Sequence, residues 1–165
     1  MKKILSLFLI VSICLCLSGC TIIHKVETAF DEIESDNDYV DNMCYEIVRC
    51  FDERDTTSLK DLFSLNICDE YDLDSQIEYA FSLYKGISES YYVTQKSWAG
   101  GYKDGIFYDK HFTPVIKEIV TDEGETYSIN YLTYYIYEED KGEIGITALG
   151  LVDESGKEIA RIGKE

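Results

Sequence analysis

The apolar residues of this chain change their spacing at Ile87, and that change limits the folds open to the chain. Before Ile87 they recur every three or four residues, as on one face of a helix, whereas after it they recur at close to every second residue. Helices followed by strands favour an α+β domain, in which the helices pack on one face of an antiparallel sheet. No internal repeat and no low-complexity segment interrupts this order.

Three helices are expected before Ile87, over residues 37–52, 58–65 and 72–85. Asp36 and Thr57 are suitable N-caps for the first two helices, and Gly86 is suited to end the third. The first helix has one apolar stripe at helical spacing, which consists of Val40, Met43, Cys44, Ile47, Val48 and Phe51. This stripe predicts the helix face that packs on the sheet.

Four to five strands are expected after the helices, over residues 88–98, 112–121, 125–138, 143–152 and 158–162. The glycines Gly100, Gly101 and Gly105 predict a loop between the first two strands. Pro114 cannot donate a hydrogen bond to a neighbouring strand, so it is expected near a strand start, at a bulge or on an edge.

The first twenty residues indicate where the protein is located. Lys2 and Lys3 precede a fourteen-residue apolar run over residues 4–17, which is shorter than the ~20 residues of a membrane-spanning helix and suits a secretory signal. The run ends in Leu-Ser-Gly-Cys at residues 17–20, which resembles the lipobox of bacterial lipoproteins. That resemblance implies cleavage between Gly19 and Cys20 and acylation of the Cys20 thiol. The alternative is an ordinary signal peptide with an incidental cysteine.

The lipobox divides the chain into a signal peptide (residues 1–19), a lipid-anchored tether (20–35) and an α+β domain (36–165). The expected location is the extracytoplasmic face of the cell membrane, with the lipid on Cys20 as the link to the membrane. Removing residues 1–19 leaves 13 basic and 32 acidic residues, a net charge of −19. Such a charge opposes binding to nucleic acid and flat adsorption on an anionic membrane.

Three cysteines remain after the signal peptide and Cys20 are set aside: Cys44, Cys50 and Cys68. Six residues of helix separate the first two by ~9 Å of rise, so they cannot form a disulfide within one helix. Cys68 could pair with either of them, but three buried thiols that act as small apolar side chains are the favoured interpretation. No C-x-x-C pair suggests a zinc or redox site.

Several segments carry a resemblance to known proteins, namely residues 58–64 (SLKDLFS), 72–77 (DLDSQI), 86–87 and 90–91. The order of elements resembles the nuclear transport factor 2-like, or cystatin-like, α+β cone. More narrowly, residues 37–152 resemble an uncharacterised lipoprotein family of Gram-positive, clostridia-like bacteria. The resemblance implies three helices on a strongly curved antiparallel sheet, and it implies no functional residue except Cys20.

Catalytic and metal-binding motifs are lacking in the sequence. It contains no G-x-S-x-G, P-loop or H-E-x-x-H motif, and its two histidines are His24 in the tether and His111 near a loop. The acidic clusters at Asp36, Asp72 and Asp74 suit helix caps and do not match a calcium loop. We therefore expect no metal and no cofactor. An isomerase or dehydratase that uses a pocket Asp–Tyr pair or a histidine is one alternative.

The tyrosine-rich segment over residues 127–137 is the best candidate for contact with a ligand. Alternation places Tyr127, Tyr131 and Tyr135 on one face of a strand, and Trp98 is a further candidate contact beside the glycine loop. The competing interpretation is that these rings line the edges of the core. The expected function is a non-enzymatic, lipid-anchored domain that binds a small ligand or a protein partner. A dimerising module that uses its sheet as the interface is a further alternative.

Overall fold

The structure is a computed structural model that describes residues 36–94, 96, 98–104 and 106–165. The expected signal peptide, the cleavage site at Gly19 and Cys20, the tether and His24 lie outside the described residues. The chain divides into two compact units, Met1–Tyr39 and Val40–Glu165. The second unit has its own apolar core and contains every element below except residues 36–39 of the first helix.

The described part of the chain contains four α-helices: residues 36–53, α2 (Thr56–Asp61), α3 (Leu65–Glu70) and α4 (Leu73–Leu83). A side-chain oxygen caps each of the last three, because Asp55, Ser64 and Asp72 accept a hydrogen bond from the backbone three residues later. None of these helices combines the length and the apolar composition needed to cross a membrane.

The single helix expected over residues 58–65 is wrong, since α2 and α3 replace it. The chain between them pairs with the sheet: Ser64 N donates to Ile146 O at 2.9 Å, and Ile146 N donates to Leu62 O at 2.9 Å. These two bonds, with the parallel bridge between Phe63 and Ile146, take up backbone groups that a continuous helix would need.

The helices are followed by one seven-stranded antiparallel sheet in the described residues, not closed into a barrel. Its strands are β1 (Ser88–Thr94), β2 (Trp98–Lys103), β3 (Ile106–Phe112), β4 (Val115–Thr121), β5 (Thr126–Tyr137), β6 (Gly145–Asp153) and β7 (Glu158–Gly163). A short 3-10 helix, Lys141–Glu143, joins β5 to β6. The expected α+β class is therefore confirmed, whereas the expected count of four to five strands is wrong.

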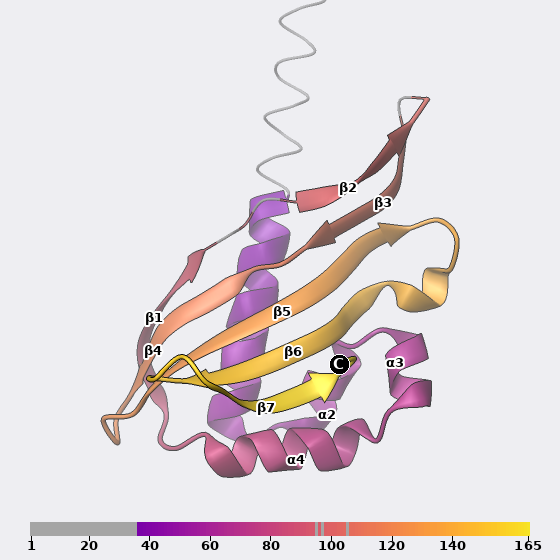
Figure 1. Cartoon of the computed structure of the whole chain (residues 1–165). Helices are drawn as coiled ribbons and strands as arrows, with labels where there is room; N and C mark the ends of the chain where they lie inside the picture. Colours follow the sequence, from indigo (N-terminus) through magenta and orange to yellow (C-terminus); the bar gives the residue numbers. More distant parts are fainter. Residues whose placement is uncertain (1–35, 95, 97, 105) are drawn as a thin grey trace, which may run out of the picture. The chain divides into compact units, whose positions relative to one another are not determined.

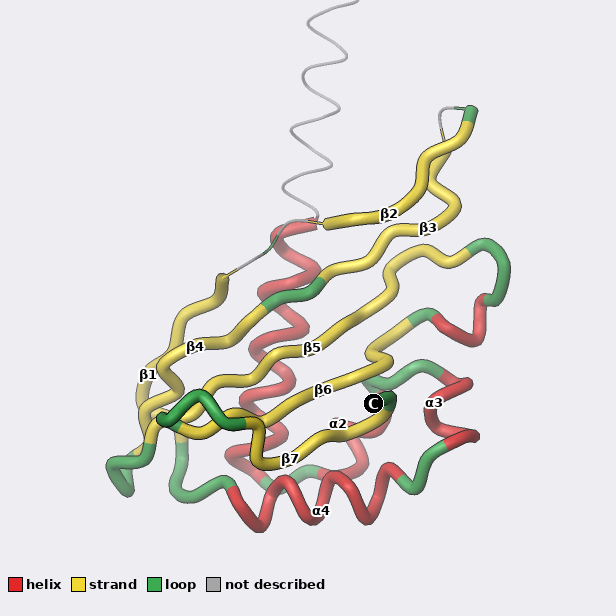
Figure 2. Tube along the Cα trace, in the orientation of Figure 1, coloured by secondary structure: helices red, strands yellow, loops and turns green. Residues whose placement is uncertain are grey.

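The long strand β5 organises the sheet (Figure 2). Its first half pairs with β4 and its second half with β3, while its other edge pairs with β6, and β7 follows β6. The strands β3 and β4 are thus two parts of one row, interrupted at Thr113 and Pro114, and β1 and β2 form the outer row. Pro114 lies directly before β4, as its missing donor predicts.

A loop was expected at Gly100, Gly101 and Gly105. It is wrong for Gly100 and Gly101, which belong to β2, and Gly105 lies outside the described residues. Gly100 and Gly101 lie opposite Lys110 and Asp109 of β3. The side chain of Tyr108 covers Gly101 so closely that a β-carbon there would overlap the ring. Glycine at this position allows close packing within a hairpin. In the sequence, such a glycine cannot be told apart from one that belongs to a loop.

The core of the second unit lies between the sheet and the helices, which cover one face (Figure 1). Phe51 of the first helix packs edge-on against Phe81 and Tyr84, with ring centroids 5.1 and 5.3 Å apart. The helix α4 runs beside β7, where Gly163 N donates to Gln76 Oε1 at 2.8 Å. One face of the sheet is therefore covered, and the opposite face remains open for a site.

Candidate functional site

Two of the expected contact residues, Tyr127 and Tyr131, lie in the core. The Tyr127 hydroxyl donates to Leu83 O at 3.1 Å and accepts from Lys85 N at 3.2 Å. The Tyr131 hydroxyl lies 3.3 Å from Cys44 Sγ. Burial raises the pKa of the Tyr127 hydroxyl, so it stays protonated and acts as a structural donor. The structure places both rings between the sheet and the helices.

The other two expected contacts, Trp98 and Tyr135, are exposed and surround a buried lysine. The ammonium of Lys110 lies 5.6 Å from the Trp98 ring centroid and 5.7 Å from that of Tyr135. It also lies 5.0 Å from Phe107 and 6.0 Å from Phe112. A cation near several aromatic faces is attracted by their quadrupoles, so Lys110 ties β2, β3 and β5 together.

The Lys110 cluster was missed by the sequence analysis. A signal for it was present, because Lys110 stands in a short segment with the aromatic residues Phe107 and Phe112. The sequence assigned Lys110 no role, because only the pairing of strands brings Trp98 and Tyr135 to the same ammonium.

A groove of about 430 Å³ crosses the sheet at the break between β3 and β4. Asn130 and Leu132 line it and alternate with the buried Tyr131, which places the groove on the face opposite the helices. The complete lining consists of Thr113, Pro114, Val115, Asn130, Tyr131, Leu132, Thr147, Ala148, Arg161, Lys164 and Glu165.

The shape of the groove follows from two irregularities of the sheet. Pro114 interrupts the row formed by β3 and β4. In β6, Thr147 is an extra residue, because Leu132 pairs with Ala148 and the next residue of β5 pairs with Ile146. Both irregularities lie at the groove, and the small side chain of Ala148 deepens it. Pro114 marks the first irregularity in the sequence, whereas no residue marks the second.

The polar groups of the groove come from three strands. Arg161 donates to both carboxylate oxygens of Glu158, at 2.8 and 2.6 Å, which fixes its guanidinium over β7. The Thr147 hydroxyl is buried and has no hydrogen-bond partner among the described residues. A buried hydroxyl of this kind is uncommon and is a reason to look for function nearby. Arg161, Thr147, Asn130 and Lys164 thus supply the polar groups around the apolar floor of the groove.

A second hollow, of about 290 Å³, lies between the first helix and β1 and is lined in part by Arg49, Asp52 and Ser88. Asp52 accepts hydrogen bonds from Ser88 N (2.9 Å), the Ser88 hydroxyl (2.5 Å) and the Tyr84 hydroxyl (3.0 Å). Burial and the Asp52 carboxylate raise the pKa of Tyr84. These contacts already satisfy the carboxylate, which indicates a structural junction.

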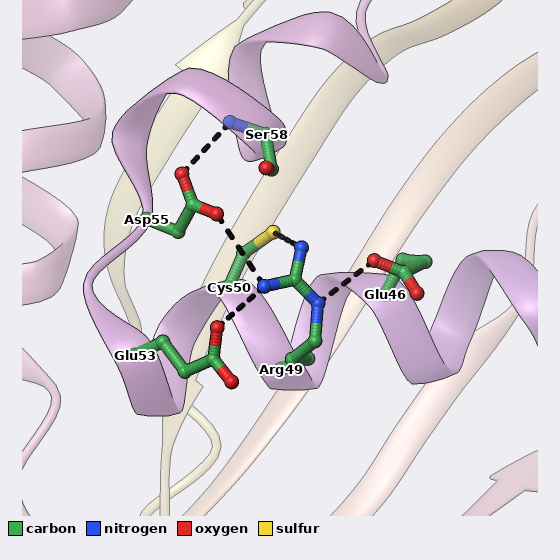
Figure 3. A network of polar contacts seen from close by, with 6 residues as sticks. All are labelled: Glu46, Arg49, Cys50, Glu53, Asp55 and Ser58. Carbon is green, nitrogen blue, oxygen red and sulfur yellow. Dashed lines mark hydrogen bonds and ion pairs between the residues drawn. The ribbon is translucent and has the colours of Figure 1, made fainter.

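Arg49 forms the other half of that junction (Figure 3). Its guanidinium donates to Glu46 at 2.9 Å, to Glu53 at 2.5 Å and to Asp55 at 3.4 Å. These carboxylates raise the pKa of Arg49, and the bond from Ser58, with help from Arg49, lowers the pKa of Asp55. The network joins the end of the first helix to the cap of α2.

The three cysteines of the domain are free thiols, with Cys44 and Cys50 buried and Cys68 partly exposed. Burial raises the pKa of Cys44 and of Cys50 to about 11. A thiol that stays protonated near neutral pH is a poor nucleophile, so neither residue is suited to catalysis.

The remaining candidate residues lie apart from the groove. His111 Nδ1 is 3.2 Å from Asp109 Oδ1, and its ring centroid is 5.2 Å from that of Tyr134, but the groove lining includes none of these three. Asp72 caps α4, and Asp74 pairs with Lys60 at 2.7 Å. Asp36 lies in the first helix. The described part of the chain contains no cluster of three or more His, Cys, Asp or Glu suited to a metal.

The fold and the groove define the class of this protein: an α+β domain with helices on one sheet face and a lined groove on the other. Residues 46–154 match the family described as Domain of unknown function (DUF5104), so the chain belongs to that family. The matched region begins in the first helix and ends just after β6. A search of the curated proteins found no match.

Proposed function

We propose that the protein is a lipid-anchored, extracytoplasmic binding domain, and that the groove on the open sheet face takes a small ligand. The groove carries this proposal, because it combines an apolar floor with polar groups that converge from β5, β6 and β7. Binding sites for small molecules have this composition, in which apolar contacts supply affinity and a few polar groups fix orientation.

The lipid anchor is proposed from the leader and from the lipobox that ends at Cys20. We also propose membership of the cone-shaped, nuclear transport factor 2-like folds and of a Gram-positive lipoprotein family, supported by the packing of a long helix against an antiparallel sheet. Labelled palmitate should appear on the protein in a bacterial host and be lost in the Cys20→Ala variant. Label that persists in this variant, or none on the native chain, would contradict the anchor.

The rim of the groove indicates the chemistry of the ligand. Asn130 offers an amide, and Arg161 and Lys164 offer positive charge in a chain whose net charge is −17. Two cations beside an apolar floor suit a small molecule with an apolar body and a carboxylate or another acceptor group. Glu158, which pairs with Arg161, and Glu165 in the lining neutralise part of this charge, so we expect weak binding of simple carboxylates.

Amide chemical shifts in solution test the groove with hexanoate and benzoate as probes. Titration should move the amide signals of Asn130, Ala148 and Arg161 before others. The Ala148→Leu variant fills the floor and should abolish these shifts, whereas Ala99→Leu, at an exposed alanine of β2, should leave them unchanged. Shifts that spread evenly over the surface, or that survive Ala148→Leu, would refute a site in the groove.

An isomerase or dehydratase remains a second candidate because of the His111–Asp109 pair. A carboxylate that orients an imidazole is the arrangement a general base requires. Nuclear magnetic resonance titration of the His111 ring decides between the two functions. If His111 is a catalytic base, its ring signals should shift when a substrate analogue is added. If His111 only packs on the sheet surface, its ring signals should not change.

A further inference from the structure

The hairpin of β2 and β3 carries four exposed apolar side chains, Trp98, Tyr102, Ile106 and Tyr108, which we term the hairpin surface. The exposed fractions of Tyr102 and Ile106 reach 62% and 70%. Figure 1 shows the hairpin extending beyond the neighbouring strands. A cluster of exposed apolar residues of this kind marks a surface that contacts another molecule.

Apolar side chains cover both faces of this hairpin. The Phe107 ring stands edge-on to Trp98 and to Tyr102, with centroid distances of 4.9 and 4.8 Å. Tyr108 is the extra residue at a register shift between β2 and β3, and its ring covers Gly101, on the face opposite Tyr102 and Phe107. Ile106 directly precedes Phe107 and points to that opposite face as well. A flat protein partner would cover only one of these faces, whereas a lipid surface that the hairpin enters would cover both.

The hairpin is also neutral in a strongly acidic protein. Residues 98–112 contain two lysines, Lys103 and Lys110, and two aspartates, Asp104 and Asp109. The net charge of −17 therefore lies in the rest of the chain. An acidic body is repelled by a membrane that contains anionic lipid, so a neutral, aromatic end is the part able to approach it. Tyrosine, tryptophan and lysine are the side chains favoured at the membrane–water interface.

The chain enters the second unit at the same end as the hairpin. Asp41 in the first helix pairs with Lys96 at 2.6 Å, only two residues before β2 begins. The 21 residues from Cys20 to Asp41 can span at most about 70 Å. If Cys20 carries lipid, as the proposed function requires, the second unit is joined to that lipid through its hairpin end.

We propose that the hairpin surface docks on the phospholipid bilayer next to the acyl anchor. The side chains enter the headgroup region and no deeper, because the outer edge of β2 has backbone groups that need water. The buried Lys110 and the rings around it hold the hairpin rigid, so little conformational entropy is lost on docking. The anchor supplies proximity and the hairpin sets the orientation of the domain.

Trp98 is the single tryptophan of the chain, so its fluorescence reports on this surface alone. The test uses residues 20–165 with Cys20→Ser, which retain the whole compact unit and carry no lipid. With phosphatidylcholine vesicles, the chain should sediment with the lipid and the Trp98 emission should move to shorter wavelength. Vesicles that contain phosphatidylglycerol should bind the chain more weakly at low salt, because the acidic domain is repelled by the anionic lipid. Added salt screens this repulsion, so the binding should increase again.

Matched variants distinguish docking through the hairpin surface from non-specific hydrophobic adsorption to vesicles. Tyr102→Ser with Ile106→Ser should weaken vesicle binding at least about tenfold, or ~1.4 kcal/mol. The control pair is Tyr79→Ser with Leu65→Ser, whose side chains on α4 and α3 are exposed to a similar extent, 57% and 71%. The control should bind vesicles as the parent chain does.

The proposal would be overturned by vesicles that leave the Trp98 emission unchanged, or by equal losses of vesicle binding in both pairs of variants. A dimer seen by light scattering without lipid, and lost only in the Tyr102 and Ile106 variant, would assign the surface to a second copy and would also overturn it. Because this chain carries no acyl group, the outcome is independent of the palmitate experiment, which tests the anchor by itself.

Discussion

Gly163 at the end of β7 allows a test of how tightly β6 and β7 pack beside α4. Its φ of +83° lies in the left-handed region, and a β-carbon there would lie 2.6 Å from the backbone oxygen of Thr147. Gly124 has nearly the same φ, +81°, but nothing within 4 Å of its β-carbon position. Alanine at either glycine has the same backbone strain, and only Gly163→Ala adds a steric overlap.

The magnitudes follow from these two terms. Left-handed backbone costs an alanine ~1–2 kcal/mol, and both variants share this term. Forcing an extra methyl group into a packed site adds ~1–3 kcal/mol, and only Gly163→Ala has this second term. We therefore expect losses in the free energy of unfolding of ~1–2 kcal/mol for Gly124→Ala and ~2–5 kcal/mol for Gly163→Ala.

Urea unfolding, followed by circular dichroism, measures both variants against the parent chain. An m-value of ~2 kcal/mol/M would turn the two losses into midpoint decreases of ~0.5–1 M and ~1–2.5 M. Gly156→Ala, which has a φ of +81° and open surroundings, is a second control and should match Gly124→Ala. Equal midpoints for Gly163→Ala and the two controls would show that β7 has room to move, and the reasoning would fail.

Three further predictions concern the helices that cover the sheet. Asp52→Ala removes the acceptor of the Ser88 hydrogen bonds and should lower the free energy of unfolding by ~2–4 kcal/mol in urea titrations. Asp55→Ala removes the cap of α2 and should cost ~1 kcal/mol in the same assay. Burial raises the pKa of Cys44 and of Cys50 to about 11, from about 9 in the unfolded chain, so stability should fall as the pH rises from 9 to 11. Replacing both cysteines by alanine should remove part of that fall, measured as Tm against pH.

The strands with regular alternation were predictable from the sequence. The expected ranges 125–138, 143–152 and 158–162 each agree with β5, β6 and β7 to within two residues at either end. These strands have one buried face, so their period of two is preserved along the sequence. The α+β class followed from the same pattern.

Elements that depend on distant partners were not predictable. The split between α2 and α3 arises from pairing with Ile146, more than eighty residues later in the chain. The hairpin of β2 and β3 could not be predicted from the local sequence. Gly101 is required there because the Tyr108 ring fills the space that a side chain would need, and that contact forms only in the folded hairpin. In both cases tertiary contacts override the local preference of the segment.

The candidate site was predictable only in part. Alternation correctly placed Tyr127 and Tyr131 on one face of a strand, but it could not tell that this face meets the helices. The groove lies on the other face and depends on the extra residue Thr147 in β6, a change of register without a sequence signal. Of the groove lining, the sequence marked Pro114 as an irregularity and Tyr131 as a candidate contact.

The two outer edges of the sheet differ, because α4 runs along β7 whereas the described strands β1 and β2 have no strand beyond them. Strand addition is therefore possible on one side only. If two molecules paired through this edge, each would occupy the free edge of the other. Assembly would then stop at a dimer and could not continue into a filament. At high protein concentration, such one-sidedness protects a β-rich protein from runaway polymerisation.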